Sequence, residues 1–70
     1  MSEFIKVKFW KNNERPYTET FGSTASALGF VEALEEQGHR KSCFLVSESG
    51  ETPLYVARDF NGNLIFKRGV

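Results

Sequence analysis

Three short runs of consecutive apolar residues in the last third of the chain most constrain its fold. They are Cys43–Val46, Leu54–Ala57 and Leu64–Phe66, and polar segments rich in Ser, Gly and Asn separate them. This pattern predicts a three-stranded antiparallel meander. A strand sends neighbouring side chains to opposite faces, so each run places apolar groups on both sides of the sheet. One helix covers only one face, and we therefore expect apolar side chains on the other.

Two further strands are predicted before the meander. Apolar and polar side chains alternate over residues 4–10, with Ile5, Val7 and Phe9 on one side, which is the period of a half-buried strand. Residues 17–21 are rich in β-forming types and are predicted to return as the second strand. We expect the side that carries Ile5, Val7 and Phe9 to pack against a helix.

One amphipathic helix is predicted between these strands and the meander. Ser23 or Thr24 offers a hydroxyl N-cap, the helix covers residues 25–37, and Gly38 ends it. The His, Arg and Lys that follow Gly38 are placed to complement the carbonyl end of the helix dipole. The apolar stripe consists of Ala27, Phe30, Val31 and Leu34, and the solvent face carries Glu32, Glu35 and Glu36.

The fold class that these elements indicate is α+β. We expect a small antiparallel sheet in the order β-β-α-β-β-β, with one amphipathic helix packed on one face, and a single domain over residues 1–70. Asn61-Gly62 predicts a tight two-residue turn of type I′ between the last two strands. The face of the fourth strand stays open at this point: either Leu54 with Val56 or Tyr55 with Ala57 faces the helix.

Composition narrows the classes of function. Nine basic and nine acidic residues balance, so there is no overall field to attract nucleic acid or an anionic membrane. The charges are unevenly placed, with three acids and no base over residues 23–38, and four bases and one acid over residues 4–15. Cys43 is the single cysteine, which excludes an intrachain disulfide and fits a reducing compartment. Without a signal-peptide or membrane-spanning pattern, we expect a cytoplasmic protein.

A protein interface is the first functional expectation. Aromatic residues make up 14% of the chain, and aromatic side chains are favoured anchors at interfaces. We expect a small, non-enzymatic, intracellular interaction module that forms a homodimer or acts as an inhibitor or adaptor of a host protein, as phage and mobile-element proteins do. The expected interface residues lie on the second sheet face and are Trp10, Phe44, Val46, Tyr55, Ala57 and Ile65.

Single-stranded nucleic acid is the alternative partner. Lys6, Lys8 and Trp10 alternate on one side of the first strand, and Lys67 lies near the end of the last. Basic side chains interleaved with aromatic ones on a sheet suit single strands, because bases stack on rings while cations follow the phosphates. A second interpretation of the same lysines is that they protect a strand edge against aggregation.

Enzymatic chemistry has little support in the residues. His39, beside Arg40 and Lys41, could serve as an acid or base in RNA cleavage, but its position at the helix exit is typical of a dipole complement. The three glutamates of the helix splay outward and lack the converging geometry of a metal site. We therefore expect no catalytic residue, no metal and no cofactor.

Overall fold

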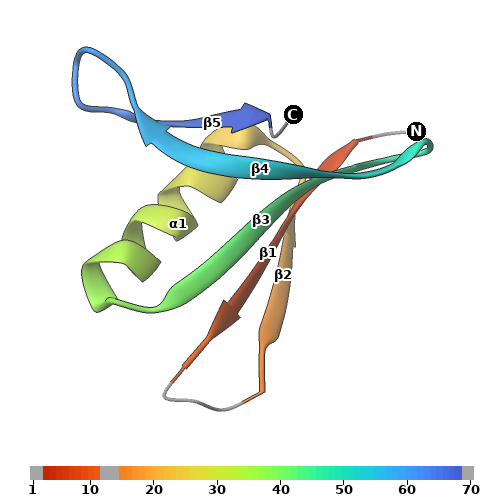
Figure 1. The fold of residues 1–70 in the computed structure, drawn as a ribbon, viewed down its shortest axis with the longest axis horizontal. Coiled ribbons are helices and arrows are strands. Elements are labelled where there is room, and N and C mark those ends of the chain that lie inside the picture. The colour runs from red at the N-terminus through yellow and green to blue at the C-terminus, as the bar shows by residue number, and fades with distance from the viewer. Residues whose placement is uncertain (1–2, 12–14, 69–70) are drawn as a thin grey trace.

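The computed structural model describes residues 3–11 and 15–68 of the chain. Five strands and one helix follow one another along this part of the sequence (Figure 1). They are β1 (Phe4–Trp10), β2 (Tyr17–Phe21), α1 (Thr24–Gln37), β3 (Arg40–Ser47), β4 (Gly50–Arg58) and β5 (Leu64–Arg68). The bounds of β1 and β2 coincide with the predicted ones, and the helix starts one residue earlier than expected.

All five strands form one antiparallel sheet in the order β2-β1-β3-β4-β5. The α+β class, the antiparallel sheet and the single helix are as predicted. The strand that follows the helix, β3, pairs with the whole length of β1, from Phe4 opposite Val46 to Trp10 opposite Arg40. This pairing joins the first hairpin to the meander and places β1 and β3 at the centre of the sheet.

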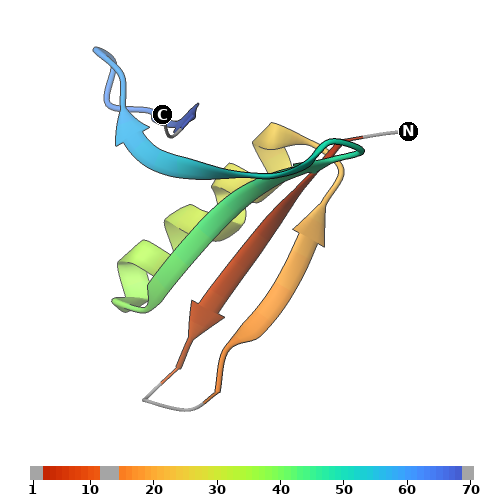
Figure 2. The same cartoon turned by 45° about the vertical axis from the view of Figure 1, so that its right-hand side comes forward.

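Local capping explains where α1 begins and ends. The Ser23 hydroxyl accepts a hydrogen bond from the N–H of Ser26 at 3.2 Å, which satisfies one of the free donors of the first turn. Gly38 ends the helix in the left-handed conformation, at φ +77°, and its N–H donates to carbonyls of the last turn. Figures 1 and 2 both show the helix on one side of the sheet, running alongside β3.

The core lies between the helix and one face of the sheet. Val7 and Val31 are completely buried, and the other buried residues of this cluster are Ile5, Phe9, Ala27, Leu34, Cys43 and Leu54. Val56 packs against the same cluster. The choice left open by the sequence is thereby settled, because Leu54 and Val56 face the helix while Tyr55 and Ala57 point away from it.

The strands of the meander are longer than their apolar runs. β3 starts at Arg40 and β4 at Gly50, so residues expected to flank the helix or to form a loop belong to the sheet. A two-residue turn, Glu48-Ser49, is enough to join these strands, because Ser47 already pairs with Gly50. The apolar pattern marked only the part of each strand that meets the core.

The predicted type I′ turn at Asn61-Gly62 is wrong. The N–H of Gly62 donates to the carbonyl of Asp59 at 3.0 Å, so Phe60 and Asn61 are the central residues of the turn. The Asp59 carboxylate accepts from the N–H groups of Asn61 and Asn63, each at 2.9 Å, which favours this longer loop. Gly62 adopts a positive φ of +83°, because the residue that follows the two central residues of this turn must be left-handed.

Candidate nucleic-acid interface on the sheet

The sheet face opposite the helix holds every residue that the sequence selected for either kind of interface. Strand registers and the alternation of side chains define this helix-free face. Its residues are Phe4, Lys6, Lys8, Trp10, Thr18, Thr20, Arg40, Ser42, Phe44, Val46, Glu51, Pro53, Tyr55, Ala57, Ile65 and Lys67. The two predicted sets of site residues therefore describe the same surface.

Charge is unevenly distributed between the two sides of the molecule. The helix-free face carries four basic side chains, from Lys6, Lys8, Arg40 and Lys67, and Glu51 is the one acid among its residues. The helix carries three glutamates and no base. A chain without net charge can thus present a positive field on one face, which the overall composition conceals.

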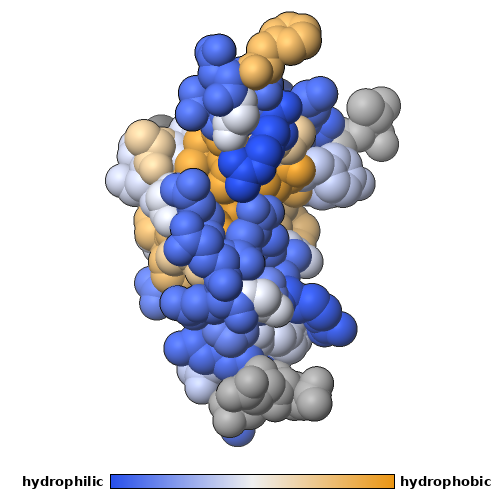
Figure 3. Space-filling model, turned by 90° about the vertical axis from the view of Figure 1, so that its left-hand side faces the viewer, coloured by the Kyte–Doolittle hydropathy of each residue, from blue (hydrophilic) through white to orange (hydrophobic). Residues whose placement is uncertain are grey.

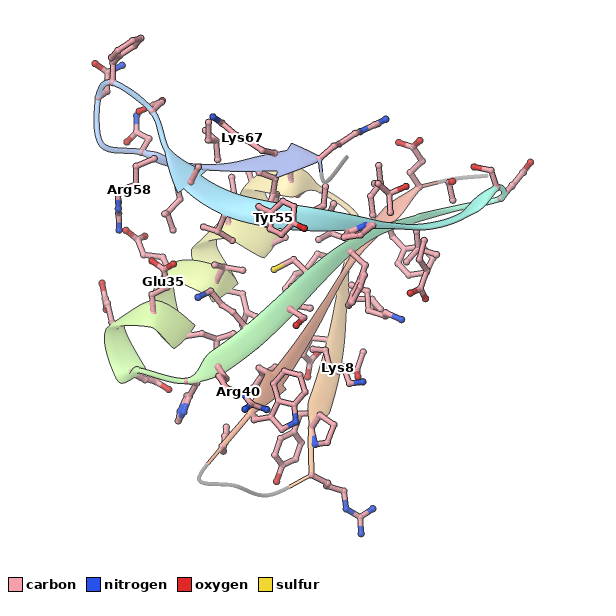
Figure 4. The ribbon with its side chains drawn as sticks, viewed as in Figure 1. Lys8, Glu35, Arg40, Tyr55, Arg58 and Lys67 are labelled. Atoms are coloured by element: carbon pink, nitrogen blue, oxygen red, sulfur yellow. The ribbon has the colours of Figure 1, made fainter. Side chains whose placement is uncertain are left out.

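Trp10 is the centre of the most concentrated cationic group on this face. The guanidinium Cζ of Arg40 lies 4.7 Å from the centre of the indole ring, and the Nζ of Lys8 lies 5.8 Å from it. Three strand positions create this arrangement, because Arg40 is directly opposite Trp10 while Lys8 is two residues away on the same strand. Figure 4 shows Arg40 and Lys8 at the lower end of the sheet.

Lys6 differs from Lys8 in having its charge compensated. Its Nζ pairs with the carboxylate of Glu51 at 2.5 Å and also lies 5.2 Å from the centre of the Phe44 ring. The aliphatic part of the side chain therefore covers apolar surface that would otherwise face water. Lys6 therefore shields part of the apolar surface that the sequence predicts on the face opposite the helix.

Tyr55 is the most accessible aromatic residue of the helix-free face, with 62% of its surface exposed. It lies directly opposite Lys67 on β5, and Figure 4 shows the two side by side. The aliphatic members of the predicted interface, Val46, Ala57 and Ile65, are only half-buried. Aromatic rings with adjacent cations thus occur at two places on this face.

The remaining candidates lie elsewhere. His39 is half-buried at the end of the helix, where its backbone N–H donates to the carbonyl of Leu34 at 3.1 Å. Glu35 pairs with Lys41 and Arg58, at 3.3 Å and 3.7 Å. Burial raises the pKa of the Cys43 thiol above its ordinary value, so this sulfur is a protonated core group. Among the described residues, no cluster of His, Cys, Asp and Glu could hold a metal ion.

Arg40 is the functional candidate that sequence reasoning missed. It was assigned to the end of the helix, whereas it begins β3 and contacts Trp10. The alternation of Arg40, Ser42 and Phe44 is the signal that could have placed it on the strand.

Comparisons with known proteins do not add to this geometry. Within the described part of the chain, no helix has the length and apolar character needed to cross a bilayer. No family model matches the sequence, and neither a curated protein nor a solved structure is significantly similar to it.

Proposed function

We propose that this protein binds single-stranded nucleic acid, without catalysis, through its helix-free face. The observation that carries the proposal is the position of Trp10 beside Arg40 and Lys8, on a face whose cations outnumber its single acid. Proteins that bind single strands combine such rings, on which bases stack, with cations that follow the phosphates.

Single strands suit this surface better than a duplex does. The bases of a duplex are stacked on one another, so an aromatic side chain on a sheet can reach only bases that are free. The cation–ring contacts at Trp10 are each worth about 0.5–1 kcal/mol at exposed sites. A base can therefore replace Lys8 on the indole at small cost, and the released ammonium is then free to bind a phosphate.

Trp10 is the only tryptophan of the chain, so its emission reports directly on the proposed site. We expect a labelled single strand to quench this emission and to bind with micromolar affinity at low salt, with affinity falling as salt rises. Trp10→Ala should weaken binding by about 1–3 kcal/mol, the usual contribution of one stacked base, and Arg40→Ala should weaken binding and flatten the salt dependence. Fluorescence anisotropy measures both effects.

Arg68→Ala is the matched control, because it removes one exposed positive charge from the other side of β5. We expect this variant to bind like the original protein. The proposal fails if no strand binds at tens of micromolar protein in low salt, or if Arg40→Ala and Arg68→Ala weaken binding equally.

Protein binding is the second candidate, and one observation favours it. Phe60 is completely exposed, at 108% of its reference surface, on a loop that Asp59 and Arg58 hold in place. The guanidinium of Arg58 donates to the carbonyl of Gly62 at 2.7 Å, which orders the loop before any partner arrives. An ordered, exposed aromatic side chain suits an inhibitor or adaptor that inserts an anchor into a host protein.

The helix-free face is also where the predicted homodimer would form, through Trp10, Phe44, Val46, Tyr55, Ala57 and Ile65. A two-fold pairing of this face would bring Lys8, Arg40 and Lys67 of one copy against the basic face of the other. Such repulsion opposes the contact, whereas a polyanion matches the same cations. This difference is why nucleic acid is the leading proposal.

A further inference from the structure

β3 and β4 separate halfway along their length. Their pairing runs from Ser47 opposite Gly50 to Cys43 opposite Leu54, although β3 begins at Arg40 and β4 continues to Arg58. Beyond this point β3 stays with β1, and β4 turns away with β5. Figure 1 shows the two strands together at the right of the view and diverging toward the left.

A cavity of about 360 Å³, here called the fork slot, occupies the space between the diverging strands. Its lining includes Ser42, Phe44 and Tyr55 from the helix-free face and Glu35, Lys41 and Cys43 from the helix side. The slot therefore connects the proposed binding face with charged groups behind the sheet. Figure 3 views the side toward which the strands diverge and shows apolar residues within a hydrophilic rim.

The charged end of the fork slot is built around Glu35. This carboxylate, on the helix, lies 3.3 Å from Lys41 and 3.7 Å from Arg58. The side chains of Lys41, Glu35 and Arg58 are 18%, 33% and 53% exposed, so the cluster remains in part accessible from solvent. Figure 4 shows Glu35 and Arg58 pointing toward each other at the open side of the fork.

The walls of the slot suit a flat aromatic ligand. Phe44 and Tyr55 are the aromatic residues of its lining, which also includes the neutral thiol of Cys43. The β3–β4 ladder ends at Cys43 opposite Leu54, and hydrogen-bonding direction alternates along a strand, so the next backbone groups that face the slot are those of Lys41 and Val56. A volume of about 360 Å³ is at the lower end of small-ligand pockets, which is enough for one nucleobase.

The chemistry of Glu35 and Lys41 selects among the bases. A carboxylate accepts two hydrogen bonds side by side, and guanine alone presents two adjacent donors, N1–H and N2–H, on its pairing edge. The neighbouring O6 of guanine is an acceptor, which the Lys41 ammonium can satisfy. Uracil and thymine place carbonyl oxygens on both sides of their single donor, and these would face the carboxylate.

We propose that the fork slot receives one guanine base of a bound single strand, with Glu35 accepting from N1–H and N2–H while Lys41 donates to O6. This inference rests on the proposed function and adds a base preference to it. The helix-free face supplies affinity for any strand, and the fork slot supplies selection at one position.

The test compares thymidine strands of about ten nucleotides that carry guanine, hypoxanthine or adenine at one central position. Guanine should improve binding about tenfold over adenine and over thymidine alone, since a good bidentate contact discriminates by about that factor or more. Hypoxanthine, which lacks the N2 amine, should lose most of the gain. Glu35→Gln should abolish the preference, measured as the ratio of the affinities for the guanine strand and the thymidine strand in the same variant.

Glu36→Gln is the matched control, because it removes the same charge from the neighbouring helix position and should keep the preference for guanine. In the original protein, the guanine strand should also shift the backbone amide signals of Lys41 and Val56 more than the adenine strand does. Equal binding of all strands, with equal shifts at these amides, overturns the base pocket and leaves the proposed function intact. No binding of any strand overturns both proposals.

Discussion

At the residue scale, Lys6 and Lys8 occupy equivalent positions in the pattern of one strand but have different electrostatic surroundings. Both alternate with apolar residues on β1, and both lie over an aromatic ring. Among the residues that the structure describes, only Lys6 of these two has an acid beside it, because Glu51 lies nearby on β4. We infer that Lys6 covers Phe44 and stabilises the sheet, whereas Lys8 has its charge available for a ligand.

This difference gives a prediction about salt dependence. Replacing Lys6 and Glu51 together by Ala removes a neutral pair, so nucleic-acid affinity and its dependence on salt should stay unchanged. Lys8→Ala removes one contact to phosphate and should reduce the slope of log affinity against log salt by about 0.7. Anisotropy titrations over a salt series measure both slopes, and a flatter slope for the double variant would assign Lys6 to the binding site.

At the element scale, the sequence predicted the strands and the helix well where burial controls them. β1 matches the prediction because alternation spans the whole strand, and β2 matches because it is rich in β-forming residue types. Ser23 and Gly38 bound the helix by local capping. The ends of β3 and β4 were missed because polar residues such as Arg40 and Glu51 pair in the sheet without reaching the core. Strand pairing is a property of the backbone, and hydrophobic patterns do not report it.

The candidate site was predictable in its location but not in its detail. Alternation placed Trp10, Lys8 and Tyr55 on one face once the helix-facing set was known. The contact between Trp10 and Arg40 depends on the register of β1 with β3, which joins residues distant in the sequence. The fork slot depends on where a ladder ends, and no motif in the sequence marks that point.

Two glycines provide a test of the elements themselves. Gly29 lies in the middle of α1, and a methyl group at this position would meet no atom within 4 Å apart from the local helix backbone. Gly29→Ala should therefore stabilise the protein by about 0.5–1 kcal/mol. Gly62 has φ +83°, and Gly62→Ala should destabilise it by about 1–2 kcal/mol because a Cβ clashes in that conformation. Urea unfolding followed by circular dichroism measures both changes. A loss of stability in Gly29→Ala would show that the helix approaches a neighbour at this position.

At the scale of the whole molecule, the main feature is a helix with only acidic charges on one side of the sheet and an excess of bases on the other. Such an arrangement supports contacts between unlike faces and opposes contacts between like faces. If the proposed function holds, the field of the helix-free face would attract the strand and the acidic helix would limit how far the strand wraps around the protein. We therefore expect the binding site to be confined to one side.

The same argument predicts the oligomeric state in the absence of ligand. A two-fold dimer through the helix-free face would oppose the cations of Lys8, Arg40 and Lys67, for which the described part of the chain shows no ion pair. Light scattering over a concentration series at moderate salt should therefore give the mass of one chain. Salt screens such repulsion within about 10 Å, so any pairing of like faces should strengthen as salt rises, and head-to-tail contacts should weaken. A dimer that forms at moderate salt and tightens in high salt would contradict the prediction. It would show that the apolar residues between these cations outweigh their repulsion, and the helix-free face would then belong to a protein interface.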